Sequence, residues 1–456
     1  MPEDQPEPRE PNPMEEFLRQ FGITPGADGT FDMNQLLGPL QQAMAQFSRQ
    51  MAAAGAGGDG LNWTFIKDIA RKAVAAAGPD PSPAASETVA IRDIVGLADL
   101  WLDQQMAFGR TTAPAATWSR AEWVEHTMGT WEQLAGSVSS SLAAAIGALM
   151  HRGAEQAPEA AGMTAMFEPM MRMAATGMLS AQVGQGIAQL ATDVLSGSDL
   201  GFPLTDKPVT ALLPTNIARF ADGLDVPMAD VRLYLALREA ARQRLFAHVP
   251  WLGPQMLALI EHYARDLTID GDAFEDAMEA QLSGGLTPER LEEFGQQMAG
   301  RLFRPALTAE QQEVLGRLET LVAIVEGWVD DVVAQTTANL LPSADALLET
   351  VRRRRASAGP SEVALKTLLN LELRPRRVRD AANLWAAVRS AKGIEERDAV
   401  WAHPDLVPTG ADLDDPLGFA EHGHVAHTEI DDLDAQLAQL IAEERGREEG
   451  QPGTDG

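Results

Sequence analysis

The chain has 456 residues, enough for one large domain or two to three smaller ones with a substantial core. Its formal net charge of −30 excludes a nucleic-acid-binding surface as the main function, since phosphate binding needs clustered Lys and Arg. The absence of cysteine excludes disulfides, thiolate catalysis and cysteine-ligated zinc or iron–sulfur sites.

The first residues, MPEDQPEPREPNP, are acidic and proline-rich and lack the basic and apolar regions of a signal peptide. Charged residues interrupt every apolar stretch before it reaches the roughly 20 residues that a membrane-spanning helix needs. We therefore expect a cytoplasmic protein without membrane contact and without a nucleic-acid partner.

Three regions are predicted along the chain. Residues 1–60 are expected to be a disordered N-terminus with short amphipathic helices, because the segment begins rich in proline and charge. Residues 61–419 show helical periodicity and form the domain. Residues 420–456 belong to an acidic flexible tail: from Asp412 to the end, 13 acidic residues oppose two arginines, which leaves a charge of −11.

The periodicity of apolar residues predicts a mainly α-helical protein with little or no β-sheet, since clear period-two strands are hard to find. Ser119 and Glu122 have the spacing of a capping box, which marks the start of a helix. The predicted helices lie at Met14–Phe21, Asp32–Ala54, Asn62–Ala77, within Glu87–Met150, and at Met163–Leu195, Gln255–Ala264, Phe274–Leu282, Pro288–Gly300, Ala309–Ala334, Ser343–Arg355, Ser361–Glu372 and Val378–Lys392.

A longer amphipathic helix is predicted within Asp225–Leu252, where Asp225 and Pro227 suit a helix start. Its polar side carries Arg238-Glu239-Ala-Ala-Arg242. This is the spacing of the H-E-x-x-H helix of metallopeptidases, with arginine at both histidine positions. The string alone has little weight, because Arg and Glu are good helix formers that recur by chance.

Four long segments carry a resemblance to a known family. They read NIARFADGLDVPMADVRLYLALREAARQRLFAHVPWL, VAIVEGWVDDVVA, RRRRASAGPSEVALKTLLNLELRPRRVRDAANLWAAV and DAVWAHPDLVPTGADLDDPLGF. Together they resemble the actinobacterial zincin-like family, whose members are described as zinc-dependent metalloproteases or candidate hydrolases. One branch is associated by name with coenzyme F420 biosynthesis. The similar region runs from about Trp63 to Phe419, and family membership does not by itself establish an activity.

The resemblance implies a set of site positions. In the family, one helix supplies two histidine ligands a turn apart, a Glu beside the first polarises a zinc-bound water, and a later helix gives the third ligand. Carried onto this sequence, the ligand positions are Arg238 and Arg242 and the general-base position is Glu239. Glu326 takes the third-ligand position, and Asp330 follows one turn later.

Arginine at both ligand positions changes what the site can do. A guanidinium stays protonated and has no lone pair for a metal, so zinc, the family cofactor, is not expected here. We predict an ion-pair cluster in which two arginines face Glu239, Glu326 and Asp330. The alternative is a rebuilt metal site that uses Glu326, Asp330 and His262, although His262 also suits an ordinary surface or core histidine.

Other candidate groups have structural explanations beside functional ones. His422, His424 and His427 could bind a transition metal weakly, but they lie in a tail that is better explained as a solvated linker. The basic clusters Arg352–Arg355 and Arg374–Arg379 could bind phosphate or an acidic partner, but intramolecular pairing is preferred. The tryptophans, including Trp251, Trp328, Trp385 and Trp401, are expected in the core.

Two functions remain open from the sequence. The first is a degenerate member of the metalloprotease family that binds a protein or peptide partner without catalysis. The second is an active metal-dependent hydrolase that uses Glu239 with a rebuilt metal site. A purely structural or interaction role is a third, weaker hypothesis.

Overall fold

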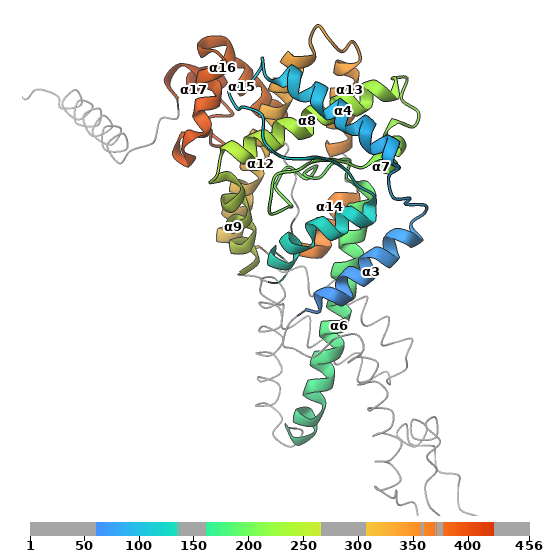
Figure 1. Ribbon diagram of the computed structural model, residues 1–456. Helices are drawn as coiled ribbons and strands as arrows, with labels where there is room; N and C mark the ends of the chain where they lie inside the picture. The colour runs from blue at the N-terminus through green and yellow to red at the C-terminus, as the bar shows by residue number, and fades with distance from the viewer. Residues whose placement is uncertain are drawn as a thin grey trace, which may run out of the picture.

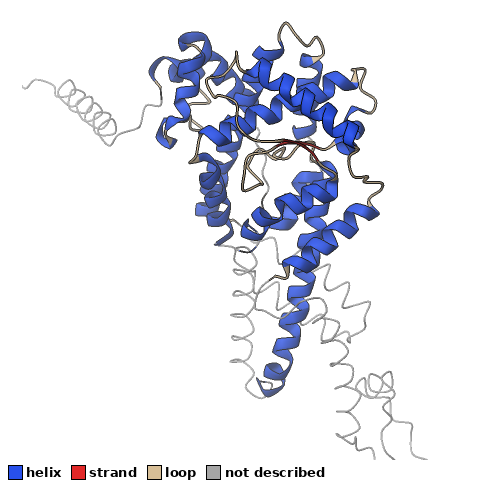
Figure 2. Cartoon of the chain, viewed as in Figure 1, coloured by secondary structure: helices blue, strands red, loops and turns tan. Residues whose placement is uncertain are grey.

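The computed structural model describes residues 61–134, 136, 161–265, 307–356, 360–369, 371 and 377–423. The predicted helices before residue 61, the two predicted between residues 274 and 300, and most of the acidic tail lie outside the described residues. Within the described part, the mainly α-helical prediction is confirmed (Figure 2). None of the helices described combines the length and hydropathy needed to cross a bilayer.

The helices and strands follow one another from Trp63 to His422 (Figure 1). They are α3 (Trp63–Ala76), α4 (Ala85–Leu102), β1 (Ala115–Thr117), α6 (Ala161–Asp193), β2 (Thr210–Leu212), α7 (Pro214–Ala221), α8 (Met228–His248), α9 (Leu252–Arg265), α12 (Ala309–Thr337), α13 (Ala344–Ala356), α14 (Pro360–Leu369), α15 (Val378–Lys392), α16 (Ile394–Ala399) and α17 (Pro416–His422). A further helix covers residues 120–134. Strands β1 and β2 pair in parallel, with Ala115 opposite Thr210.

Local capping explains several helix starts. The Asn62 side chain accepts a hydrogen bond from the Phe65 amide at 3.0 Å, which satisfies one amide that the first turn of α3 leaves free. The predicted capping box is present, since the Ser119 amide donates to Glu122 and the Glu122 amide donates to Ser119 Oγ. Helix α8 begins at Met228, directly after the predicted Pro227, but the expected side-chain cap from Asp225 is not formed. Its N-cap is Pro227, with no side-chain hydrogen bond.

Helix α8 lies at the centre of the described fold and is buried on every side from Val231 to Leu245, apart from one half-buried position. The polar side predicted for this helix is therefore buried as well, and it faces the acidic residues of α12. Helix α4 runs parallel to α8, held by ion pairs between Glu87 and Arg232 and between Asp99 and Arg244. Charged side chains inside a core need partners. On another side of α8, helix α12 supplies partners for Arg238 and Arg242.

Helix α12 packs closely against α15. A Cβ added at Gly327 would lie 2.6 Å from Ala381 Cβ, so only glycine permits this crossing. The Trp385 indole donates to the Ile324 carbonyl at 2.8 Å across the same contact. Trp328, Trp385 and Trp401 are fully buried as predicted, whereas Trp251 is half-buried. This contact fixes the position of α12 and hence of its acidic residues.

A second group of helices consists of α3, α6 and α14 (Figure 1). Gly184 of α6 meets α3 so closely that an added Cβ would lie 2.8 Å from Ile69 Cγ2. The missing side chain of Gly184 therefore lets α6 approach α3 closely. The chain leaves α6 in a loop that leads to β2 and passes beside α8.

Candidate functional site: a buried arginine–carboxylate centre

Arg238 of α8 reaches two carboxylates of α12. Its Nη2 lies 2.7 Å from Glu326 Oε2, and its Nη1 lies 2.5 Å from Asp330 Oδ1. Because Glu326 and Asp330 are one turn apart on α12, the planar guanidinium can donate to both at once. Arg238 is only 1% exposed.

Arg242, one turn further along α8, shares the same acidic partner. Its Nη1 lies 2.9 Å from Glu326 Oε1, so each oxygen of Glu326 takes one arginine of α8. Its Nη2 lies 3.1 Å from Glu239 Oε2. The predicted ion-pair cluster of Arg238, Arg242, Glu239, Glu326 and Asp330 is therefore present, and we call these five residues the arginine centre.

Glu239 is held by the loop between α6 and β2. Ser196 Oγ donates to its Oε2 at 2.7 Å, and the Ser198 amide and hydroxyl donate to its Oε1 at 3.1 and 2.9 Å. Gln243 Nε2 adds a hydrogen bond at 3.0 Å. Neither serine was among the residues predicted for the site. The small residues of the run Ser-Gly-Ser could have pointed to a close approach.

The loop reaches Glu239 through its backbone geometry. The Gly197 amide donates to the Ala211 carbonyl of β2 at 3.0 Å, which lays the loop beside the strand. Gly197 then faces Glu239, since an added Cβ would lie 3.3 Å from Oε1. Gly201, with φ of +89°, turns the chain past Glu326. Glycines therefore allow the loop to surround both glutamates.

Helix α13 adds a second layer of arginines. Arg352 Nη2 lies 3.0 Å from Asp330 Oδ2, and Arg355 Nη1 donates to Glu326 Oε2. Arg354 Nη1 lies 3.0 Å from Asp199 Oδ2, and its Nη2 donates to the Asp193 carbonyl. The expected intramolecular pairing of this basic cluster is confirmed. We call Arg352, Arg354 and Arg355 the outer arginines.

The charges of the two layers balance. Five carboxylates (Asp193, Asp199, Glu239, Glu326 and Asp330) face five guanidiniums, which are Arg238, Arg242 and the three outer arginines. Equal numbers of opposite charges remove the cost that an unpaired buried charge would carry.

The surroundings set the protonation states of the centre. Burial raises the pKa of Glu326, but Arg355, Arg242 and Arg238 outweigh it and hold that pKa well below its usual range. Burial lowers the pKa of Arg242, yet Glu326 and Glu239 raise it above the ordinary value. The glutamate at the third-ligand position is thus ionised and surrounded by cations at neutral pH.

The residues present do not fit a zinc ion. Zinc needs three or four side chains with free lone pairs, and the two imidazole positions hold guanidiniums. Both oxygens of Glu239 and of Glu326 already accept hydrogen bonds from buried donors. No group of three His, Cys, Asp or Glu side chains placed to hold a metal ion occurs among the residues that the structure describes.

The remaining candidates lie apart from the centre. His262 pairs with Glu310 at 3.2 Å near the surface, with 43% of its side chain exposed. The structure does not bring it into contact with Glu239 or Glu326. His422 ends α17 and contacts the Gly418 carbonyl, while His424 and His427 lie outside the described residues. Arg377 of the second basic cluster pairs with Asp380 and Asp414.

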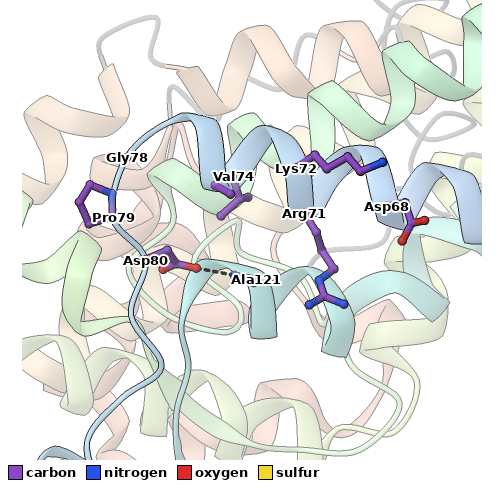
Figure 3. Close-up of a pocket in the computed structure, with 9 residues that line it drawn as sticks. Asp68, Arg71, Lys72, Val74, Gly78, Pro79, Asp80 and Ala121 are labelled. Carbon is purple, nitrogen blue, oxygen red and sulfur yellow. Dashed lines mark hydrogen bonds between the residues drawn. The ribbon is translucent and has the colours of Figure 1, made fainter.

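A cavity of about 550 Å³ lies elsewhere, between α3 and the helix that begins at Arg120 (Figure 3). Asp80 on its rim is already used, because its carboxylate accepts the amides of Arg120 and Ala121 at 2.9 Å. Arg71 pairs with Glu125. The cavity shares no lining residue with the arginine centre.

Comparisons with known proteins agree with this architecture. A crystal structure of a candidate hydrolase with a novel fold from Chloroflexus aurantiacus is similar, with a TM-score of 0.52 and 18% sequence identity. The match covers 79% of this chain and 98% of that chain. At this identity, the likeness establishes a shared mainly helical fold. No curated protein matches the chain.

A family model for zincin-like metallopeptidases matches residues 61–420. The match covers most of the chain, so the protein belongs to the zincin-like metallopeptidase family. The matched range includes Arg238, Glu239 and Arg242 of α8.

Proposed function

We propose that this chain is a zinc-free member of its family that binds another protein or a peptide without hydrolysing it. The observation that carries the proposal is the burial and ion pairing to Glu326 of Arg238 and Arg242, the two residues at the predicted histidine positions. A zinc-activated water has no place to form beside Glu239, whose oxygens accept from serine hydroxyls.

The kind of partner is inferred from the family. Peptidases recognise polypeptides, so we infer a polypeptide as the class of ligand for this member of the family. A net charge of −30 disfavours nucleic acid as that partner. The cytoplasmic location and the narrower resemblance to the actinobacterial branch remain predictions.

The metal content of the untagged protein tests the proposal directly. Protein purified without chelators and then dialysed against zinc should contain far less than one zinc per chain by mass spectrometry of the metal. It should also show no metal-dependent cleavage of casein or of a peptide library. Stoichiometric zinc that disappears in Glu326→Ala, but not in the surface control Glu349→Ala, would instead support an active hydrolase with a rebuilt site.

Partner binding needs its own measurement. Crosslinking in cells followed by identification should give the same protein with the wild type and with Glu349→Ala. That protein, purified, should then bind the chain in calorimetry without being cleaved. If the protein contains no zinc and none of the purified candidates binds it, the binding role is contradicted. A structural role would then be the remaining explanation.

A further inference from the structure

Helix α13 is held to the fold in two different ways along its length. Its first half buries the apolar side chains of Ala344, Leu347 and Val351. Its second half is the run Arg352–Arg355, with no apolar residue before Ala356. Only the first half is therefore anchored by the hydrophobic effect.

The second half is attached by charge. Three of its four arginines contact carboxylates of the centre or of the loop after α6, with side chains 27%, 23% and 19% exposed for Arg352, Arg354 and Arg355. Arg353 points outward with 78% of its side chain exposed and pairs only with Glu349. Water therefore reaches the outer arginines, and salt can screen their ion pairs.

The inner layer behaves differently. Arg238, Arg242 and Glu326 are each 1% exposed and lie between helices that are packed by buried apolar residues. Buried pairs are screened much less than exposed ones. The ion pairs of the arginine centre should thus be insensitive to salt, whereas those of the outer arginines should be sensitive to it.

We propose that residues 352–356 form a strap that opens and closes over the arginine centre and is fastened there by the outer arginines. In the closed arrangement, five guanidiniums face five carboxylates. Opening removes the three outer arginines, so Arg238 and Arg242 remain opposite all five carboxylates and the uncovered group has a net charge of −3. This inference follows from the ion pairs and does not rest on the proposed binding of a protein partner.

Hydrogen exchange read by mass spectrometry tests the strap in the wild-type chain. Amides of residues 352–356 should exchange faster than those of Ile324–Val333 in α12, and raising NaCl from about 0.05 M to about 1 M should accelerate them by roughly tenfold. The α12 amides should not respond. Exchange of both segments in step at both salt concentrations would overturn the proposal.

Two matched variants separate fastening from general charge. Arg355→Gln removes a guanidinium from Glu326, whereas Arg353→Gln removes the same charge from the same helix without touching the centre. We expect faster exchange of residues 352–356 in the first and wild-type exchange in the second. An equal effect of both variants would contradict the strap.

The arginine-rich sequence of the strap can also be added as a separate peptide. In the triple variant R352Q/R354Q/R355Q, the added peptide TVRRRRAS (residues 350–357) should bind at least roughly tenfold more tightly than to Arg353→Gln, because three freed carboxylate contacts await it. Equal binding to both proteins would count against an opened acidic layer. If the triple variant does not fold, the wild-type exchange experiment still decides.

Discussion

Glu326 is the residue on which the charges of the site converge. Its two oxygens accept from Arg238, Arg242 and Arg355, which come from α8 and α13. Replacing one partner of a buried ion pair leaves the other charges uncompensated, and this costs more than the intact pair contributes. Loss of the Glu326 carboxylate would therefore deprive three guanidiniums of a shared ion-pair partner.

Substitution of Glu326 should accordingly be severe. We expect Glu326→Gln to lower the free energy of unfolding by about 3–5 kcal/mol, the range for breaking a buried pair. Urea unfolding followed by circular dichroism measures it. The control Glu349→Gln, at an exposed pair with Arg353, should change stability by less than about 0.5 kcal/mol. Similar losses in both variants would argue against a special role for the centre.

The lowered pKa of Glu326 gives a pH dependence of known sign. In the unfolded chain a Glu titrates near 4.3, whereas in the folded protein its pKa is well below that. Its stabilising contribution is therefore complete above about pH 5 and is lost as the pH falls towards the folded value. The stability difference between wild type and Glu326→Gln should thus shrink between about pH 5 and pH 3. A constant difference across this range would contradict an ionised Glu326.

Residue-scale predictions from the sequence succeeded where the family correspondence fixed a helix face. Arg238, Arg242, Glu326 and Asp330 meet as expected, since i and i+4 residues share a face. The serine partners of Glu239 were not predictable in the same way. Ser196 and Ser198 lie 43 and 41 residues away from it in the chain, and only the folded path of the loop brings them together.

At the scale of elements, the α12–α15 contact depends on one glycine. Gly327 follows Glu326 directly, and its missing side chain lets α15 approach the backbone of α12. Any movement of α12 here would also move the carboxylates that face α8. The helix packing and the arginine centre are therefore mechanically linked through adjacent residues.

The same helix offers a matched pair of glycines. Gly327→Ala places a Cβ 2.6 Å from Ala381 Cβ and should destabilise the protein by about 1–3 kcal/mol through overpacking. Gly316→Ala meets nothing within 4 Å and should stabilise it by up to about 1 kcal/mol, because Ala is the better helix former. Thermal unfolding of both variants checks the opposite signs. A stabilising Gly327→Ala would mean that the two helices can separate freely.

The bounds of helices and strands were predicted well where local sequence signals are strong, and less well where tertiary contacts determine them. Helices α3, α13 and α15 lie within a residue or two of their expected limits, since apolar spacing and caps are local properties. The start of α8 was predicted near Pro227, but the expected Asp225 cap is not formed. The two short strands β1 and β2 agree with the expected small β content, but three-residue strands leave no period-two pattern by which to locate them.

For the whole molecule, charge is distributed unevenly between inside and outside. The arginine centre and the outer arginines, with their partners Asp193 and Asp199, are balanced, so the surplus of negative charge in the sequence lies elsewhere on the chain. Excess charge of one sign destabilises a compact state by self-repulsion. Salt should therefore strengthen the fold as a whole while it weakens the outer arginine contacts.

Calorimetry can measure that global effect. Raising NaCl from about 0.05 M to about 0.5 M shortens the screening length several-fold, and the temperature of unfolding should rise by a few degrees as repulsion weakens. The same scan on Glu326→Gln should show a rise of similar size, since surface charge is unchanged. A fall of the unfolding temperature with salt in the wild type would mean that attractive pairs dominate its stability.

The arginine centre also bears on how the protein reaches its native state in a cell. A fold whose central charges come from a bound ion competes with other proteins for a limited supply and is incomplete when that supply fails. Here the two positive charges at the centre are covalent parts of the chain, the side chains of Arg238 and Arg242. Zinc starvation should leave its folded abundance unchanged, so synthesis and turnover alone set how much of it the cell holds.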